Sequence, residues 1–254
     1  MDRRTTASNP PRPEGAVAVV TGAGQGIGAA VARVLLDGGW RVAALDLDGA
    51  GLADLKGPGV VTRVGDASDG DTLAALIDDA TALGPVVAGV ANAGIFLDDR
   101  VPKLDDDRWG RVLDVDLTGP FRLLRALWPQ MVDHGFGRFV AMSSVAKDGN
   151  FGQANYAAAK AGLVGLAKTA AIEGGRSGIT ANVLCPGVIE TPANASFREA
   201  APAAYEKFLS RVPARRAGSA ADVANVCGFL LSESAGYVSG QVLYVDGGLS
   251  CGHT

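Results

Sequence analysis

The sequence predicts an α/β domain built around one mostly parallel, doubly wound β-sheet with helices on both faces. Short apolar runs rich in β-branched residues alternate with longer helical stretches along the 254-residue chain, which is the order of strand–helix–strand units. Several runs are apolar throughout, as expected for strands that helices cover on both faces. In such sheets a ligand binds outside the carboxyl ends of the strands, so the residues that follow each run are the first candidates for a site.

Strands and helices can be assigned to this alternation in order. The expected strands are Ala16–Val20, Arg41–Leu45, Val60–Val64, Val86–Ala91, Arg138–Met142, Ile179–Leu184 and Gln241–Val245. The helical stretches between them are Ile27–Asp37, Asp71–Leu83, Asp105–Met131, Asn155–Glu173 and Ala220–Leu231. Ser219 precedes the last helix and Asp222 follows three residues later, which is the pattern of a capping box.

The chain is expected to form one domain over residues 15–254, because no second proline-rich or low-complexity linker interrupts it. Residues 1–14 contain three prolines with Ser, Thr and Arg, and they predict a disordered leader. No apolar segment follows the arginines of this leader, so it is not expected to be a signal peptide.

Composition argues against several classes of function. The net charge of −4 argues against nucleic acid as the main partner. The two histidines, His134 and His253, are too few for a Ser-His-Asp triad or a His-rich metal site. Cys185, Cys227 and Cys251 form neither a disulfide framework nor a Cys-x-x-Cys pair, so we expect no metal and a reduced, cytoplasmic setting. No apolar run reaches the roughly 18 residues that cross a bilayer.

A glycine-rich loop joins the first strand to the first helix. Residues 21–28 read Thr-Gly-Ala-Gly-Gln-Gly-Ile-Gly. Glycines there permit a tight turn, let backbone N–H groups approach a pyrophosphate and let the helix pack close to the strand, while the helix N-terminus favours the phosphate charge. The loop therefore predicts dinucleotide binding by Gly22, Gly24, Gln25, Gly26, Ile27 and Gly28.

An acidic residue, Asp46, stands at the end of the second strand, eighteen residues after Gly28. A carboxylate there can accept hydrogen bonds from the ribose hydroxyls of adenosine and repels the 2′-phosphate of NADP. No Arg or Lys closely follows Asp46 or interrupts the glycine loop. The expected cofactor is therefore NAD(H), with NADP the alternative.

Tyr156 and Lys160 are spaced by four residues at the start of an Ala-rich helix, so the phenol and the ammonium share one helix face. The pair follows a strand that ends in Ser143 and Ser144. A free tyrosine has a pKa near 10 and a proton shuttle needs about 7, a difference of about 4 kcal/mol. One cation at about 4 Å supplies on the order of 4 kcal/mol, so the lysine is expected to bring the pKa of the phenol close to neutral.

In this order, the glycine loop, the acid-ended second strand, the serine and the Tyr-x-x-x-Lys pair resemble the classical short-chain dehydrogenase/reductase family, and within it the 3-oxoacyl-acyl carrier protein reductases. The resemblance covers about residues 15–250 and implies a Rossmann-type fold. Further family motifs follow the third, fourth and sixth strands. Together with Leu47, which follows the second strand, they complete the expected cofactor contacts with Asp66, Ala67, Asn92, Ala93, Gly94, Pro186, Gly187, Ile189 and Thr191.

The resemblance also implies catalytic roles. Tyr156 is expected to act as general acid and base, Lys160 to bind the nicotinamide ribose and lower the pKa of the phenol, and a serine to hydrogen-bond the substrate oxygen. Counting back thirteen residues from Tyr156, the family's common interval, reaches Ser143, whereas the register of the strand favours Ser144. Register is the stiffer criterion, because a one-residue slip reverses every side chain, so Ser144 is preferred.

One residue departs from the family pattern. Members carry an asparagine that supports a proton relay through water at the position of Asp116. A carboxylate accepts hydrogen bonds but cannot donate them when ionised. We expect Asp116 to assist catalysis, with a purely structural role as the alternative.

Substrate contacts are expected from Ile95–Phe96, Lys147–Phe151, Val188 and a lid at about 192–216. The lid is mostly apolar and favours a neutral secondary alcohol or ketone. A 3-oxoacyl reductase remains an alternative, although the segment Asp133–Phe136 lacks a cation and only Arg176 could dock an acidic carrier.

The resemblance also implies a homotetramer, with a monomer as the alternative. A dinucleotide-binding sensor or scaffold without turnover is a rival from another class, and a lyase or epimerase that uses the cofactor transiently is a second.

Overall fold

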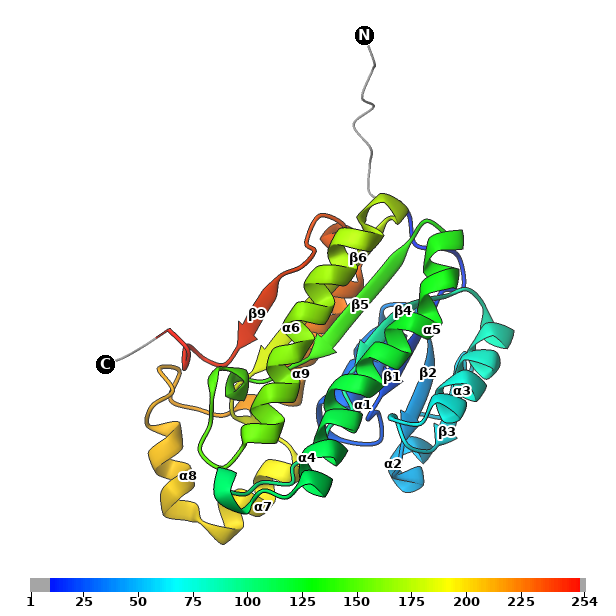
Figure 1. The fold of residues 1–254 in the computed structure, drawn as a ribbon. Coiled ribbons are helices and arrows are strands. Elements are labelled where there is room, and N and C mark those ends of the chain that lie inside the picture. The colour runs from blue at the N-terminus through cyan, green and yellow to red at the C-terminus, as the bar shows by residue number, and fades with distance from the viewer. Residues whose placement is uncertain (1–9, 252–254) are drawn as a thin grey trace.

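The computed structural model describes residues 10–251, apart from the side chains of residues 193, 196 and 197. Its centre is a seven-stranded sheet in the order β3-β2-β1-β4-β5-β6-β9, in which each neighbouring pair runs parallel. This confirms the predicted doubly wound sheet (Figure 1). The strands are β1 (Val17–Thr21), β2 (Arg41–Asp46), β3 (Val60–Val64), β4 (Val86–Ala91), β5 (Gly137–Met142), β6 (Ile179–Pro186) and β9 (Val242–Val245).

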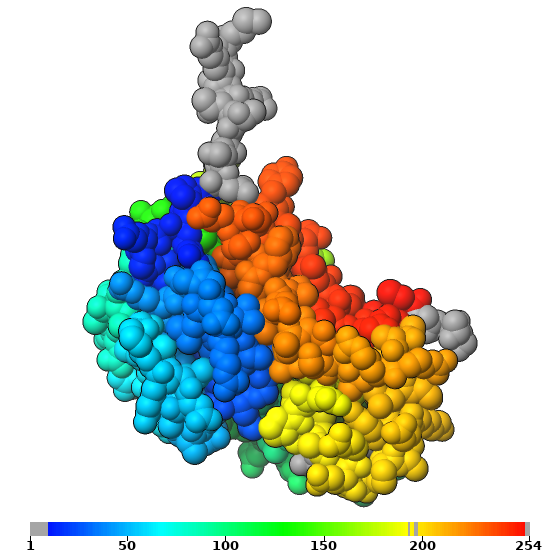
Figure 2. All heavy atoms as spheres, turned by 180° about the vertical axis from the view of Figure 1, so that it is seen from behind, coloured from blue at the N-terminus to red at the C-terminus, as the bar shows by residue number. Residues whose placement is uncertain are grey.

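Helices cover both faces of the sheet because each buries an apolar stripe against it. One face carries α1 (Gly26–Asp37) and α9 (Ala220–Leu231), which pack side by side (Figure 2). The other carries α3 (Gly70–Leu83), α5 (Gly119–Asp133) and α6 (Ala154–Gly174), in front of the strands in Figure 1. Two separate apolar clusters fill these interfaces. The predicted capping box of Ser219 and Asp222 is present at the start of α9.

The helix expected over Asp105–Met131 is interrupted, which corrects the prediction. The segment consists of α4 (Asp106–Leu113), a π-helical turn η2 (Asp114–Thr118) and α5. The backbone stays helical at both ends of the turn, at Leu113, Asp114, Thr118 and Gly119, so periodicity alone did not reveal the break. Such a turn inserts an extra residue and re-aims its side chains, which is why π turns recur at functional sites.

Two further helices, α7 (Pro192–Ala200) and α8 (Pro202–Leu209), lie beyond the carboxyl ends of the strands (Figure 1). They occupy most of the expected lid. A two-stranded sheet of β7 (Ile189–Glu190) and β8 (Gly218–Ser219) fastens the two ends of this segment, and Val188, Tyr205 and Val212 form its small core. The remaining short helices are α2 (Gly49–Ala53), η1 (Val101–Lys103), η3 (Val145–Asp148), η4 (Gly175–Ser177) and η5 (Glu233–Ala235).

The expected leader, 1–14, divides into two parts. Residues 1–9 lie outside the described residues, whereas 10–14 pack on the body of the protein. The guanidinium of Arg12 lies 4.8 Å from the ring centroid of Trp40 and donates to Gly38 O, and the Arg12 N–H donates to Glu233. The part of the expected leader that the structure describes thus contacts the body of the protein through Arg12. No helix within residues 10–251 is both long and apolar enough to span a membrane.

Candidate functional site

The direction in which the strand order grows reverses between β1 and β4, so the loops that follow these strands turn to opposite faces of the sheet and leave a crevice between them. A cleft of about 800 Å³ opens there. The segments after β1, β2, β3, β4, β5 and β6 all contribute to its walls, together with residues of η2, α6 and α7. The cleft is thus located where the sequence predicted a ligand.

The glycine loop has the close contacts that its sequence predicted. Gly22 has a φ of +66° and Gly26 one of +55°, conformations that favour glycine. A Cβ on Gly28 would lie 1.9 Å from Gly22 O, so only glycine permits this approach of α1 to the loop. The Asn92 amide donates to Thr21 O and Gly22 O and ties the end of β4 to the same loop.

Asp46 closes β2 and lies beside the glycine loop. One carboxylate oxygen accepts a hydrogen bond from Gly24 N at 2.7 Å, and the other accepts one from Asp48 N at 2.9 Å. These amides hold the carboxylate at the cleft wall while leaving further lone pairs free. Asp48 instead caps α2 by accepting from Ala50 N.

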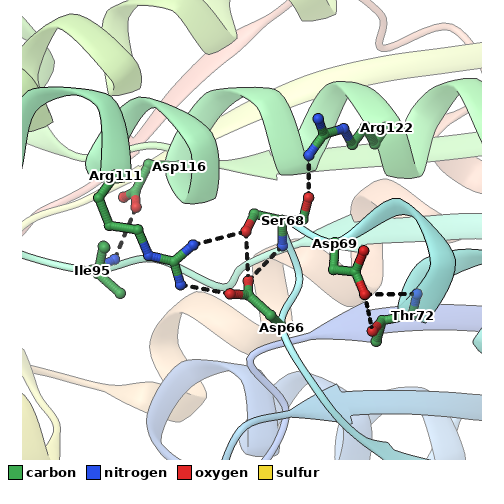
Figure 3. Close-up of polar contacts among 8 residues, drawn as sticks. All are labelled: Asp66, Ser68, Asp69, Thr72, Ile95, Arg111, Asp116 and Arg122. Carbon is green, nitrogen blue, oxygen red and sulfur yellow. Dashed lines mark hydrogen bonds and ion pairs between the residues drawn. The ribbon is translucent and has the colours of Figure 1, made fainter. Parts of the chain in front are cut away.

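Asp66 follows β3 and is bound on two sides (Figure 3). Ser68 donates to it from both backbone and side chain, and Arg111 of α4 forms an ion pair with it at 2.6 Å. Burial tends to raise the pKa of Asp66, but the bonds from Ser68 and Arg111 outweigh this and lower it. Arg111 also lines the cleft. Sequence reasoning missed Arg111, because nothing local links it to a residue 45 positions away.

Tyr156 and Lys160 share one face at the start of α6, and both line the cleft. The Lys160 ammonium lies 5.3 Å from the centroid of the Tyr156 ring and donates to Met142 O at 2.9 Å. Ser144 is a hydrogen-bonding neighbour of the Tyr156 phenol. The Ser143 hydroxyl instead donates to Lys160 O at 2.8 Å, so of the two serines Ser144 is the one beside the phenol.

Asp116 lies in the π-helical turn and is fully buried. One carboxylate oxygen accepts a hydrogen bond from Ile95 N at 2.9 Å (Figure 3). The other lies 3.1 Å from the Lys160 ammonium. The Asp116 side chain therefore lies behind Lys160 rather than on the cleft surface. The sequence had offered two roles for it, assistance to catalysis and a purely structural one.

The pKa of Tyr156 differs in direction from the value that the sequence predicted. Burial raises the pKa of Tyr156; Lys160 opposes this rise and Asp116 adds to it. The net direction is upward, whereas the sequence argument expected the lysine to bring the phenol near neutral. The sequence argument counted the attraction between Lys160 and the phenolate. It left out the removal of the phenol from water and the negative charge of Asp116, and both of these raise the pKa of Tyr156 in the protein without cofactor. Burial likewise raises the pKa of Asp116, and Lys160 opposes that shift.

Most of the predicted site residues meet in the one cleft. Gly24, Gly28 and Asp116 do not line it; they lie behind its surface, in the contacts described above. Those that line it are Gly22, Gln25, Gly26, Ile27, Asp46, Leu47, Asp66, Ala67, Asn92, Ala93, Gly94, Ser144, Tyr156, Lys160, Pro186, Gly187, Ile189 and Thr191. Among the described residues, no cluster of His, Cys, Asp and Glu could hold a metal ion.

Comparisons with known proteins agree with this geometry. A family model described as enoyl-(acyl carrier protein) reductase matches residues 22–250. An acetoacetyl-CoA reductase of Synechocystis sp. is 41% identical over 236 residues, which cover 92% of this chain and 96% of the relative. The 3-oxoacyl-[acyl-carrier-protein] reductase FabG of Salmonella typhimurium is 37% identical over 244 residues, 93% of this chain and 98% of the relative. The chain belongs to the short-chain dehydrogenase/reductase family.

A solved structure supports the same assignment. The crystal structure of a variant of actinorhodin polyketide ketoreductase with NADPH superposes with a TM-score of 0.88 at 34% identity, covering 93% of this chain and 97% of that one. The short-chain dehydrogenase/reductase fold, the cleft and the relatives together identify this chain as an oxidoreductase that acts on CH–OH or keto groups.

The wall at which a substrate was expected is largely apolar and aromatic in this short-chain dehydrogenase/reductase. Of the expected wall residues, Ile95, Phe96, Val188 and part of the 147–151 segment line the cleft, as does Phe208 of α8. Lys147 and Asp148 do not, because they pair with each other and Asp148 accepts from the hydroxyl of Tyr244 on β9. The contribution expected from Lys147–Phe151 thus comes from Asn150 and Phe151.

Proposed function

We propose that the protein is an NAD(H)-dependent oxidoreductase that interconverts a secondary alcohol and a ketone through Ser144, Tyr156 and Lys160. The observation that carries the proposal is a single cleft with two different ends. At one end a glycine loop adjoins the carboxylate of Asp46. At the other, a phenol, a hydroxyl and an ammonium stand together.

The residues at the first end fit a dinucleotide. The space between Gly22 and Gly28, which a single Cβ would fill, lets backbone N–H groups approach a pyrophosphate. Asp46 would accept hydrogen bonds from the adenosine ribose hydroxyls. Lys160 would bind the nicotinamide ribose, and the segment Pro186–Thr191 would hold the carboxamide.

The residues at the second end fit proton transfer to and from a carbonyl oxygen. A nicotinamide bound there would supply the hydride acceptor for oxidation and the hydride donor for reduction. Tyr156 takes the hydroxyl proton of the alcohol as a phenolate, or donates its proton to the carbonyl oxygen as a phenol. Ser144 donates a hydrogen bond to the same oxygen and stabilises its negative charge. On oxidation the proton taken up by Tyr156 then passes to solvent, and on reduction the phenolate of Tyr156 takes a proton from solvent, which balances both directions.

The preference for NAD(H) rests on charge at the adenosine end. The Asp46 carboxylate repels a 2′-phosphate. Among the described residues that line the cleft, the cations are Arg111 and Lys160; Arg111 is paired with Asp66 and Lys160 with Asp116. The ketoreductase compared above was solved with NADPH, so cofactor choice in this chain is a direct test of Asp46.

The decisive experiment measures turnover of a panel of secondary alcohols and ketones with NAD(H) and with NADP(H), for the wild type and for Tyr156→Phe. We expect Tyr156→Phe to retain dinucleotide binding, followed by fluorescence, and to lose turnover by at least about 10²-fold. Tyr237→Phe is the matched control, because Tyr237 is 98% exposed. Unchanged turnover in Tyr156→Phe would refute the mechanism, and absence of turnover throughout the panel would favour a binding protein without catalysis.

A 3-oxoacyl thioester reductase is the second candidate, and the two relatives described above favour it. The same panel should therefore contain acetoacetyl-CoA and an acetoacetyl-acyl carrier protein. The segment Asp133–Phe136 offers an acidic carrier no cation. We expect any thioester activity to be greater with the CoA substrate; a preference for the carrier-bound substrate would contradict this.

We further propose a cytoplasmic homotetramer. Large apolar side chains remain uncovered on the outer helices of the single chain: Trp109 is 39% exposed, Phe121 44% and Ile172 82%. A second copy of the chain would cover them. Light scattering of the purified protein measures the assembly, and a monomeric mass would refute it.

A further inference from the structure

The buried ion pair between Asp116 and Lys160 has no place in the mechanism above. The Asp116 and Lys160 side chains are 0% and 4% exposed, and the carboxylate oxygen and the ammonium nitrogen are 3.1 Å apart. Gly94 makes room for the pair: a Cβ there would lie 2.8 Å from the carboxylate oxygen and 3.2 Å from the ammonium. The second Asp116 oxygen is fixed by Ile95 N, so the carboxylate is held in place from both sides.

The ion pair with Asp116 affects the positive charge of Lys160. An ammonium has three N–H donors. One is given to Met142 O. The contact with Asp116 at 3.1 Å is an ion pair in which the carboxylate oxygen accepts no hydrogen bond, so Asp116 acts on Lys160 through its charge. The positive charge is thus balanced by a negative charge inside a site that water hardly reaches, where charges act over longer distances than in solvent.

We propose that Asp116 is a positioning residue that neutralises Lys160 and moves the pH range in which Tyr156 exchanges its proton to higher values. The catalytic consequence rests on the function proposed above, but the electrostatic claim concerns the protein alone. Without Asp116, the ammonium would act on the phenol with its full charge. With Asp116, the phenolate is disfavoured.

Other charged groups near Tyr156 do not account for this effect. Asp98 also raises the pKa of Tyr156, as a minor contribution, but Asp98 is exposed and its charge is screened by water. Cys185 of β6 also interacts electrostatically with Lys160, but burial raises the pKa of its thiol, so it is neutral at pH 7. Asp116 is therefore the buried charge that opposes Lys160 among the described residues.

The direct test follows the ionisation of Tyr156 without cofactor or substrate. Phenolate absorbance is titrated with pH in the wild type and in Tyr156→Phe, and the difference between the two curves reports Tyr156 alone among the four tyrosines. We expect a midpoint above the roughly 10 of free tyrosine. In Asp116→Asn the midpoint should fall by on the order of one pH unit, because Asn retains the acceptor for Ile95 N but carries no charge.

Asp114→Asn is the matched control. Asp114 lies in the same π-helical turn but is exposed, so the same change of charge there should leave the midpoint in place. An equal shift in both variants would overturn the proposal, as would an unchanged midpoint in Asp116→Asn, which would mean that Asp116 is already protonated. Asp116→Ser serves as a second uncharged variant. If neither folds, a wild-type midpoint below about 10 overturns the proposal.

Turnover supplies a separate readout. Alcohol oxidation needs the phenolate, so the rise of kcat/KM with pH should occur at lower pH in Asp116→Asn than in the wild type. Ketone reduction needs the phenol, so its loss at high pH should also begin earlier. Failure of the proposed function would appear as unchanged turnover in Tyr156→Phe, and the spectroscopic titration would still decide the role of Asp116.

Discussion

The ring of Phe96 lies 4.6 Å from the ring of Tyr156, measured between centroids, with the two planes tilted by 40°. Phe96 is 53% exposed, so one part of its ring covers the phenol and another faces the cleft. Aromatic pairs in this arrangement contribute about 0.5–1.5 kcal/mol beyond the area they bury. Phe96 thus both shelters Tyr156 and presents an apolar surface to the cleft.

Phe96→Ala should weaken the binding of apolar substrates. We expect kcat/KM to fall roughly 5- to 30-fold, equivalent to about 1–2 kcal/mol, mainly through a higher KM because the lost contact serves ground state and transition state alike. Steady-state kinetics on a series of ketones of increasing apolar size measure this. Phe229→Ala is the control, because Phe229 of α9 is similarly exposed, at 47%, but does not line the cleft. Equal losses for both variants would contradict the role of Phe96.

Gly28→Ala should destabilise the protein and abolish dinucleotide binding. The new methyl carbon would lie 1.9 Å from Gly22 O and 2.6 Å from the Asn92 amide nitrogen, and neither can move without breaking the loop. We expect a loss of at least about 2 kcal/mol in the free energy of unfolding, measured by denaturant titration.

Gly110→Ala is the matched helical control for that change. Gly110 lies in α4 with no atom near its potential Cβ, so alanine there should be neutral or stabilise the helix by up to about 1 kcal/mol. Indistinguishable stabilities for the two variants would show that the close contact at Gly28 is relaxed in solution.

The elements that could be predicted are those with local signals. Strand β3 lies where its β-branched run placed it, and α9 begins at the predicted capping box. The break at Asp114–Thr118 had no such signal, because its residues continue the apolar helical pattern and the π turn is defined by how the backbone closes its hydrogen bonds.

In the candidate site, too, the features with a local sequence signal could be predicted and those that depend on distant contacts could not. The glycine loop, Asp46 and the Tyr156–Lys160 spacing are local patterns. The ion pair of Asp66 with Arg111 joins residues far apart in sequence, and the upward direction of the Tyr156 pKa depends on burial, which spacing does not report.

Thiol reactivity should separate the three cysteines. Cys185 and Cys227 are buried and Cys251 is exposed. Burial raises the pKa of Cys227 to about 12, so its reactive thiolate is scarce at neutral pH. A disulfide reagent should label one thiol quickly in the native protein and all three after denaturation. Cys251→Ser should remove the fast phase; its persistence in that variant would mean that a core thiol becomes exposed.

Asp46→Asn should shift cofactor choice toward NADP(H). The change keeps one oxygen that can accept from Gly24 N but removes the negative charge that repels a 2′-phosphate. Hydrogen bonds to a charged group contribute about 1.5–3 kcal/mol, so the ratio of kcat/KM for NAD(H) over NADP(H) should fall by roughly 10- to 100-fold. Asp48→Asn is the control: Asp48 is the neighbouring acid, but it caps α2 and should leave the ratio unchanged. A wild type that already prefers NADP(H), or a ratio that responds equally to both variants, would show that Asp46 does not set the preference.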